Sequence, residues 1–124
     1  MEIKALVANS SNKERKNITQ SLKDIGVKTV VEATDGKKAM ELLQKGKYNF
    51  IFAEFNTQTT EWDELVKAAR KIDGKLPIIV TAPQSKNVEE LKKACPTASK
   101  YLTMPFTTEQ LQKTVGEYAP SLAV

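Results

Sequence analysis

Apolar residues follow two alternating patterns along the chain. Five short runs have the length and the β-prone composition of buried strands, and each is followed by a segment in which apolar residues recur every three or four positions. The strand-like runs are residues 3–8, 27–33, 48–54, 77–81 and 101–103. The pattern therefore predicts five β-α units in succession, (βα)5.

The five helical segments each carry an apolar face that we expect to be buried. These faces consist of Ile18, Leu22 and Ile25; Ala39, Met40, Leu42 and Leu43; Trp62, Leu65, Val66, Ala69 and Ile72; Val88, Leu91 and Cys95; and Leu111, Val115 and Tyr118. Ser11 followed by Glu14 predicts a capping box at the first helix, and Thr107 caps the last helix toward Gln110. Asp35-Gly36 predicts a turn before the second helix.

Strands that alternate with helices require right-handed crossovers, and hence a parallel sheet that is covered on both faces. Five units of this size fit an α/β, doubly wound sheet with strand order 2-1-3-4-5, the flavodoxin-like arrangement. The chain has 124 residues and no linker rich in Pro, Gly or Ser. Residues 1–124 are therefore expected to form one domain.

The lengths of the apolar runs also bear on location. No run approaches the roughly 20 residues of a membrane-spanning helix, and the first residues do not resemble a secretory signal. The single cysteine, Cys95, excludes an internal disulfide and lies on an apolar helical face, which indicates a small core residue. The cytoplasm is the expected compartment, with no membrane partner.

Basic residues outnumber acidic ones by 19 to 15, which gives a net charge of +4. They do not cluster in the sequence: Lys13, Arg15 and Lys16 open one helix, whereas Lys92 and Lys93 lie far along the chain. Lysines without interleaved aromatic or arginine residues attract phosphates only in a non-specific, salt-sensitive way. We interpret them as solvated helix faces, and specific nucleic-acid binding is not expected.

Ligands of open parallel sheets bind outside the carboxyl ends of the strands, at the switch point between the first and third strands. The residues predicted at these ends are Ala8 and Asn9, Glu54, Thr81, and Thr103 with Met104. A single carboxylate is a weak start for a Mg²⁺ site, and the chain has no histidine to serve as a base. We therefore expect no catalytic residue, no metal, no cofactor and no enzymatic activity.

The turn at residues 9–12 supports an alternative hypothesis. Hydroxyls and free amides at a helix N-terminus bind phosphate groups, so the Asn9-Ser10-Ser11 loop could sense a small anion or nucleotide. The loop contains no glycine that would let the backbone wrap around a phosphate. Ser11 is also sufficiently explained as a helix cap.

Several segments together resemble the CheY-like receiver domains of two-component response regulators. The matching segments, which span essentially the whole chain, are Val7–Ser11, Glu32–Ala39, Phe52–Asn56, Pro77–Ala82 and Tyr101–Thr107. In active receivers, an acidic pair after the first strand holds Mg²⁺, an aspartate at the end of the third strand accepts the phosphoryl group, and a lysine before the final proline contacts it.

The resemblance places different residue types at each of those positions. Ala8 and Asn9 stand at the acidic pair, Glu54 at the phosphoacceptor and Met104 at the lysine. Phosphoryl transfer requires metal and cation to neutralise developing charge, so the resemblance implies a degenerate phosphorylation pocket. The unpaired Glu54 carboxylate is expected to turn toward solvent or toward Lys13.

Two residues of the family pattern are retained. Thr81 stands where a hydroxyl follows the phosphoryl group, and Tyr101 where an aromatic ring moves on activation. The simpler interpretation is that Thr81 ends a buried strand and that Tyr101 is a half-buried aromatic on an edge strand. The family also implies a cis peptide between Met104 and Pro105.

The leading functional hypothesis is a phosphorylation-independent pseudo-receiver that acts as a protein–protein interaction module in two-component or chemotaxis signalling. Receivers bind targets, or a second copy of themselves, through the fourth helix, fifth strand and fifth helix. We expect other signalling proteins as partners and this face as their docking surface. Its exposed residues are predicted to include Lys92, Lys100, Thr103 and Gln112.

Overall fold

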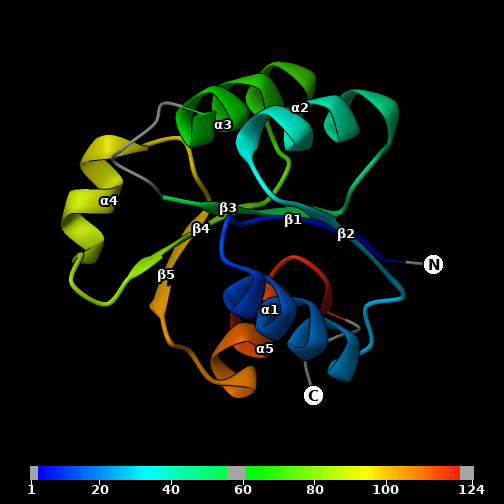
Figure 1. The fold of residues 1–124 in the computed structure, drawn as a ribbon, viewed down its shortest axis with the longest axis vertical. Coiled ribbons are helices and arrows are strands. Elements are labelled where there is room, and N and C mark those ends of the chain that lie inside the picture. Colours follow the sequence, from blue (N-terminus) through cyan, green and yellow to red (C-terminus); the bar gives the residue numbers. More distant parts are fainter. Residues whose placement is uncertain (1–2, 56–60, 121–124) are drawn as a thin grey trace.

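The chain forms a parallel sheet whose strands alternate with helices (Figure 1). The computed structural model describes residues 3–55 and 61–120. The strands are β1 (Lys4–Ala8), β2 (Thr29–Ala33), β3 (Phe50–Glu54), β4 (Ile78–Pro83) and β5 (Lys100–Met104). The helices are α1 (Asn12–Asp24), α2 (Gly36–Lys45), α3 (Glu61–Ile72), α4 (Val88–Ala94) and α5 (Thr108–Gly116). The strand order is β2-β1-β3-β4-β5, which confirms the predicted fold class.

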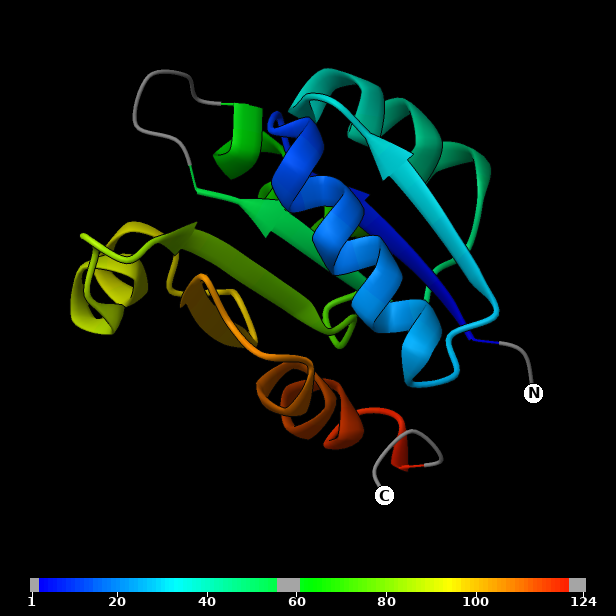
Figure 2. The same cartoon turned by 60° about the horizontal axis from the view of Figure 1, so that its bottom comes forward.

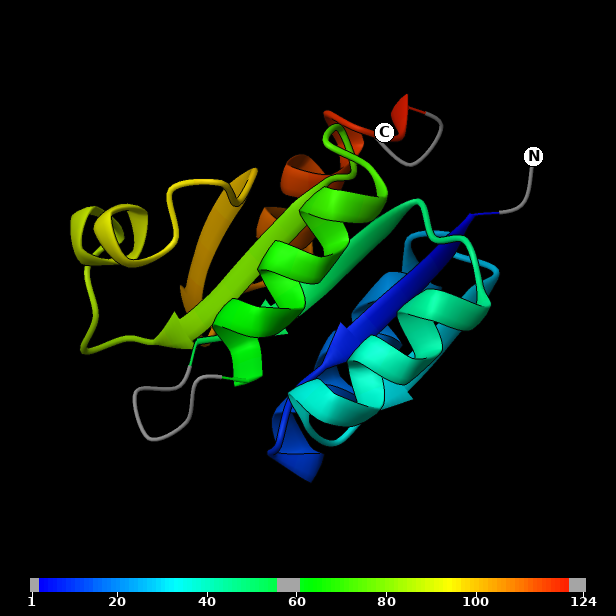
Figure 3. The ribbon, with the colours of Figure 1, turned by 90° about the horizontal axis from the view of Figure 1, so that it is seen from above.

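Helices cover both faces of the sheet. α1 and α5 lie against one face, α2 and α3 lie side by side on the other, and α4 lies beside β5 (Figures 1 and 3). The central strand β3 divides its side chains between the two cores: Phe50 and Phe52 face α1 and α5, whereas Ile51 and Ala53 face α2 and α3. Burial on both faces explains why this strand is almost continuously apolar.

The register of the strands positions the candidate site. Ala8 pairs with Ala53, and Glu54 pairs with Thr81 on the next strand. Because all strands are parallel, their carboxyl ends meet at one edge of the sheet, which we call the carboxyl edge. The start of β1 and the end of α5 lie toward the opposite, amino edge (Figure 2).

The helix starts differ in part from the predictions. Thr107 and Gln110 form a reciprocal capping box at α5. At α1 only half of the predicted box is present, because the Ser11 hydroxyl accepts from the Glu14 amide while the Ser11 amide donates to Asn9. The turn predicted at Asp35-Gly36 is a bend at residues 34–35, and Gly36 is already the first residue of α2. Asp35 is the N-cap of this helix, and its carboxylate accepts the amide of Lys38.

Three residues predicted to face the core are exposed instead. Ile72 is 57% exposed at the end of α3, Val88 is 39% exposed at the start of α4, and Tyr118 is 38% exposed beyond α5. Each lies at or beyond a helix end, where the periodic stripe extends past the sheet that would cover it. Cys95, by contrast, is buried just after α4, as predicted.

The polar loop predicted at residues 56–60 lies outside the described residues. In the described ranges, every helix is too short or too polar to cross a membrane.

Candidate functional site

The carboxyl edge brings together most of the residues predicted for the pocket. Strand alternation places the side chains of Glu54 and Thr81 on the same face as Phe52, toward α1 and α5. Ala8 instead packs in the core on the α2–α3 side and contributes only a methyl group. Met104 pairs with Pro83, two positions past Thr81, at the far end of β5.

Glu54 is held by the loop between β1 and α1. The Ser10 hydroxyl and the Ser10 amide both donate to Oε1 of Glu54, at 2.8 Å and 3.1 Å. The carboxylate was expected to turn toward solvent or toward Lys13. Its hydrogen bonds do lie at an exposed position, but they come from Ser10 and not from Lys13. Glu54 therefore links β3 to the β1–α1 loop.

Asn9 lies in the middle of this loop and is 98% buried, with 2% of its surface exposed. Its Oδ1 accepts the amide of Ser11 at 2.8 Å, an Asx-type turn that leads into α1. Its Nδ2 has no hydrogen-bond partner among the described residues. The side chain is thus committed to shaping the loop through its oxygen.

Arg15 anchors the same loop and was missed by the sequence interpretation, which placed it on a solvated face. It is only 6% exposed. Its guanidinium donates to the Asn9 carbonyl at 3.0 Å, to the Asn12 side chain, and to Glu32 on β2 at 2.9 Å. Because Arg15 precedes Ile18 by three residues, helical spacing already placed it on the apolar face, and that was the available signal.

Glu32 balances the buried charge of Arg15. Lys16 also donates to Glu32, at 3.2 Å. Burial alone would raise the pKa of Glu32, but hydrogen bonds from Lys16 and Arg15, together with their charges, lower that pKa below its ordinary value. Arg15, Lys16 and Glu32 thus form a cluster of two cations and one carboxylate that joins α1 to β2.

A second carboxylate lies near Glu54. Burial, and then the negative charge of Glu54, raise the pKa of the Glu14 carboxyl on α1 above its ordinary value. The loop at the start of α1 is therefore flanked by two acidic groups, each of which would repel a bound anion.

The side chains at the carboxyl edge do not provide suitable ligands for a divalent cation. Ala8 has no ligand atom, Oδ1 of Asn9 accepts from Ser11, and Oε1 of Glu54 accepts twice from Ser10. In the described ranges, no three His, Cys, Asp or Glu side chains lie close enough to hold a metal ion. Mg²⁺ requires a near-octahedral set of oxygen ligands with carboxylates among them, and these residues do not provide it.

Tyr101 lies on edge strand β5 and is half-buried, in agreement with the simpler interpretation. Its ring packs against the core on the α2–α3 side, and its hydroxyl donates to the carbonyl of Cys95 at 2.6 Å. Burial, and then the neighbouring Cys95, raise the pKa of the Tyr101 hydroxyl. The ring is thus held inward, against the residue that ends α4.

The face formed by α4, β5 and α5 is less open than predicted. Lys92 is exposed, and the side chain of Lys100 is 41% exposed. Thr103 and Gln112 are half-buried, so the prediction that all four are exposed was wrong for these two. Lys100 pairs with Glu117 at 2.8 Å, and the hydrogen bond from Lys100 to Glu117 raises the pKa of Lys100. At the turn into α5, the Met104–Pro105 peptide is cis, as the resemblance implied.

Comparison with known proteins agrees with this architecture. The family model for the response regulator receiver domain matches residues 5–116, so the chain belongs to the response regulator receiver family. Members of this family are signalling proteins. The chain is 24% identical over 115 residues to the chemotaxis protein CheY of Pseudomonas aeruginosa, covering 91% of this chain and 93% of the relative. It is 25% identical over 113 residues to CheY-3 of Vibrio cholerae, covering 90% and 87%.

Solved structures share the fold. The chemotaxis protein CheY4 of Vibrio cholerae superposes with a TM-score of 0.83 at 26% identity and covers 95% of this chain and 99% of that one. The receiver domain of the sensor histidine kinase PA1611 of Pseudomonas aeruginosa, described with a magnesium ion in its active-site cleft, has a TM-score of 0.83 at 16% identity, covering 97% and 99%. At that identity, the second likeness shows the fold alone.

Proposed function

We propose that this receiver domain works without phosphorylation, as a protein–protein interaction module in two-component or chemotaxis signalling. The observation that carries the proposal is the contact between Ser10 and Glu54, in which Oε1 of the carboxylate at the phosphoacceptor position accepts two hydrogen bonds. The family identity supports a signalling role, and the chemistry of the strand ends supports the loss of phosphoryl transfer.

Several observations disfavour phosphoryl transfer together. The transferred group carries negative charge that metal ions and cationic side chains must neutralise. Here Ala8 and Asn9 stand where the family has its acidic pair, and Met104 stands where it has its lysine. The PA1611 receiver holds magnesium in its cleft, whereas the donors at this carboxyl edge are used in internal hydrogen bonds. The proposal therefore includes a phosphorylation pocket that has lost its chemistry. Its residues are Ala8, Asn9, Glu54, Thr81 and Met104.

The proposed docking surface is the face of α4, β5 and α5. Lys92 on α4 and Lys113 on α5 are exposed there, and Tyr101 fixes β5 to the end of α4 through the Cys95 carbonyl. We propose other signalling proteins in the cytoplasm as partners, and self-association through the same face. Such contacts need no chemistry at the carboxyl edge.

The alternative of an anion or nucleotide sensor at Asn9–Ser11 is not favoured. The Ser10 amide and hydroxyl donate to Glu54, and the Ser11 amide donates to Asn9. An anion would have to displace the Glu54 carboxylate and tolerate the nearby charge of Glu14. The hydrogen-bond donors of Ser10 and the amide of Ser11 are therefore used internally.

Phosphorylation independence is tested by incubating the protein with acetyl phosphate and Mg²⁺ and measuring its intact mass. We expect no change. A phosphate-sized, Mg²⁺-dependent increase that disappears in Glu54→Gln would overturn the proposal.

The interaction role is tested with charge reversals. Once a partner has been captured, calorimetry compares Lys92→Glu/Lys113→Glu with the control Lys13→Glu/Lys37→Glu, which changes the same net charge elsewhere. We expect affinity to fall only in the first pair. Glu54→Gln should change it by less than about 1 kcal/mol, because the pocket takes no part in binding. A tenfold loss in that variant would indicate that Glu54 instead acts as a permanent mimic of the phosphorylated state.

A further inference from the structure

Lysines that are scattered in the sequence gather at the amino edge of the sheet. The reason is topological, because the amino ends of parallel strands and the loops that precede them lie on the same edge. The residues there are Lys4, Lys28, Lys45, Lys47, Lys71 and Lys75, which we call the basic edge. These lysines do not cluster along the sequence, and the fold brings them to one edge.

The charge of the basic edge is largely unneutralised. Lys28, Lys45, Lys47 and Lys71 are exposed, and none forms an ion pair with another described residue. Among the described residues, three carboxylates also lie at this edge: Asp24 and Asp73, which accept hydrogen bonds from Gln20 and from the Lys75 amide, and Glu117, which lines a groove there. The six lysines outnumber them, and this excess of positive charge favours an acidic partner.

An apolar groove opens within the basic edge, between the ends of α2 and α3. Its volume is about 440 Å³, and it is lined by Leu43, Gln44, Lys45, Gly46, Lys47 and Ile72. Ile72 is one of the few large apolar side chains that the structure leaves exposed. Lys4 lies beside the groove. Its Nζ is close to the groove residue Gly46, because a Cβ added to that glycine would lie 3.3 Å from the Nζ atom. Apolar surface and positive charge thus coincide.

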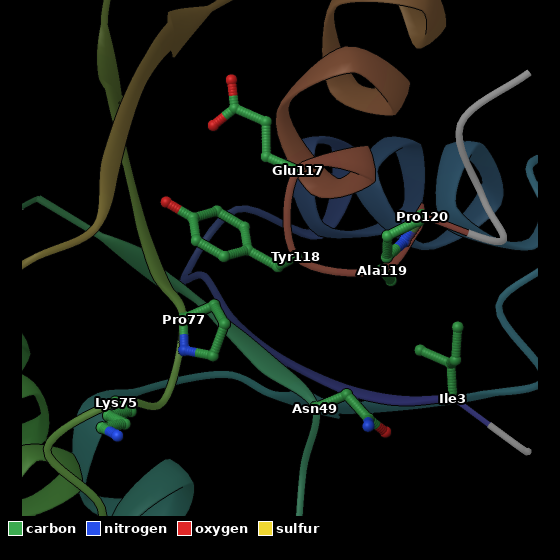
Figure 4. Close-up of a pocket in the computed structure, with 8 residues that line it drawn as sticks. All are labelled: Ile3, Asn49, Lys75, Pro77, Glu117, Tyr118, Ala119 and Pro120. Atoms are coloured by element: carbon green, nitrogen blue, oxygen red, sulfur yellow. The ribbon is translucent and has the colours of Figure 1, made fainter.

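A second groove continues this edge toward α5 (Figure 4). Its volume is about 780 Å³, and it lies between the residues that follow α5 and the loops before β3 and β4. Tyr118, another exposed apolar side chain, faces Pro77 across it, and Lys75 and Asn49 stand at its border (Figure 4). Apolar lining and a lysine occur together here too, although Glu117 also lines this second groove.

We propose that the basic edge binds an acidic protein segment with a bulky apolar residue, which enters the groove at Ile72 while neighbouring carboxylates pair with Lys45, Lys47 and Lys4. This surface lies at the opposite end of the strands from the phosphoacceptor position. It is also distinct from the face of α4, β5 and α5, so the inference does not depend on the proposed function.

An acidic protein segment fits better than a nucleic acid. The cations of the basic edge are all lysines, which lack the bidentate geometry of arginine toward phosphates. The nearby Arg70 is occupied, because its guanidinium donates to the carbonyls of Leu76 and Thr97 and to the Ser99 hydroxyl. An apolar groove flanked by cations suits an apolar side chain flanked by carboxylates.

The test uses a short labelled peptide with Leu and Phe at its centre and Asp and Glu on both sides. Binding is followed by fluorescence anisotropy at low ionic strength, and its location by amide shifts of the ¹⁵N-labelled protein. We expect saturable binding with shifts at residues 43–47 and 70–77. Lys45→Glu/Lys47→Glu should weaken it by about tenfold or more, and Ile72→Ser by about fivefold.

The control variant Lys13→Glu/Lys37→Glu carries the same charge change at the carboxyl edge and should stay within about twofold of the original affinity. Circular dichroism establishes that each variant is folded, and the milder Lys45→Gln/Lys47→Gln should give an intermediate loss. Absence of saturable binding, equal loss in the control variant, equal binding of a peptide with Ser in place of Leu and Phe, or tighter binding of a DNA duplex would each overturn the proposal.

Discussion

The hydroxyl and the amide of Ser10 both donate to the same oxygen of Glu54, at 2.8 Å and 3.1 Å. This contact joins the loop that follows β1 to the last residue of β3. In the wider family, the corresponding carboxylate is the group that reacts. In this chain Oε1 of Glu54 accepts two hydrogen bonds from Ser10 instead, which is the structural role that the proposed phosphorylation-independent function assigns to this carboxylate.

The contact predicts an energetic coupling between Ser10 and Glu54. A hydrogen bond to a charged acceptor at an exposed site should contribute about 1 kcal/mol. Urea unfolding of Ser10→Ala, Glu54→Ala and the double variant measures the coupling in a double-mutant cycle. The exposed Ser85, paired with Glu54 in a parallel cycle, should show none. A coupling near zero for Ser10 would mean that the contact is not maintained in solution.

Restoring the acceptor alone should not restore phosphorylation. In Glu54→Asp the carboxylate is the right length, but Ala8, Asn9 and Met104 still supply neither metal ligands nor a cation. Because the groups of such a pocket act as a unit, we expect labelling by acetyl phosphate only when Ala8→Asp, Asn9→Asp and Met104→Lys are added. Intact mass measures the outcome, and appreciable labelling of the single variant would contradict it.

The fold was predictable because its signal is local. Apolar runs and helical stripes are written in consecutive residues, and the central strand β3 shows burial on both faces as an unbroken apolar run. The candidate pocket followed from the same pattern, because the ends of parallel strands meet at one edge. The predicted stripes failed at Ile72 and Tyr118, where helical periodicity continues beyond the sheet.

The contacts within the site were harder to predict because they join distant residues. Ser10 and Glu54 are 44 positions apart, and Arg15 and Glu32 are 17 apart. Charge alone suggested Lys13 as the partner of Glu54, whereas the backbone path of the β1–α1 loop presents Ser10. The basic edge was missed for the same reason, because its lysines come together only once the strands are parallel.

The charge of Glu54 should affect the titration of Glu14. Burial is the larger cause of the raised pKa of Glu14, and the charge of Glu54 is the smaller one. In Glu54→Gln the pKa of Glu14 should therefore fall but stay above its ordinary value. Carboxyl ¹³C shifts measured against pH report the pKa of Glu14 in the natural chain and in Glu54→Gln. An unchanged Glu14 pKa in Glu54→Gln would show that the two groups do not interact.

The Arg15–Glu32 pair should make stability depend on pH in the acidic range. Arg15 is buried, and removing its carboxylate partner leaves a charge that is only partly compensated by the Asn9 carbonyl and the Asn12 side chain. We expect Glu32→Gln to cost about 1–3 kcal/mol of unfolding free energy at neutral pH. The matched control is Glu41→Gln, which disrupts only an exposed pair with Lys38 at 3.9 Å and should cost less than about 0.5 kcal/mol.

The sign of the pH dependence follows from the lowered pKa of Glu32. A carboxyl whose pKa is lower in the folded state stabilises the fold above its unfolded pKa, and this contribution is lost as the pH falls through the folded pKa. The difference in stability between the natural chain and Glu32→Gln should therefore be constant from neutral pH down to about the ordinary pKa of a glutamate. Below that value the difference should shrink and then vanish, because protonation removes the same charge as the substitution. Chemical unfolding at a series of pH values measures the difference directly, and a difference that persists at acidic pH would assign the effect to packing rather than to the ion pair.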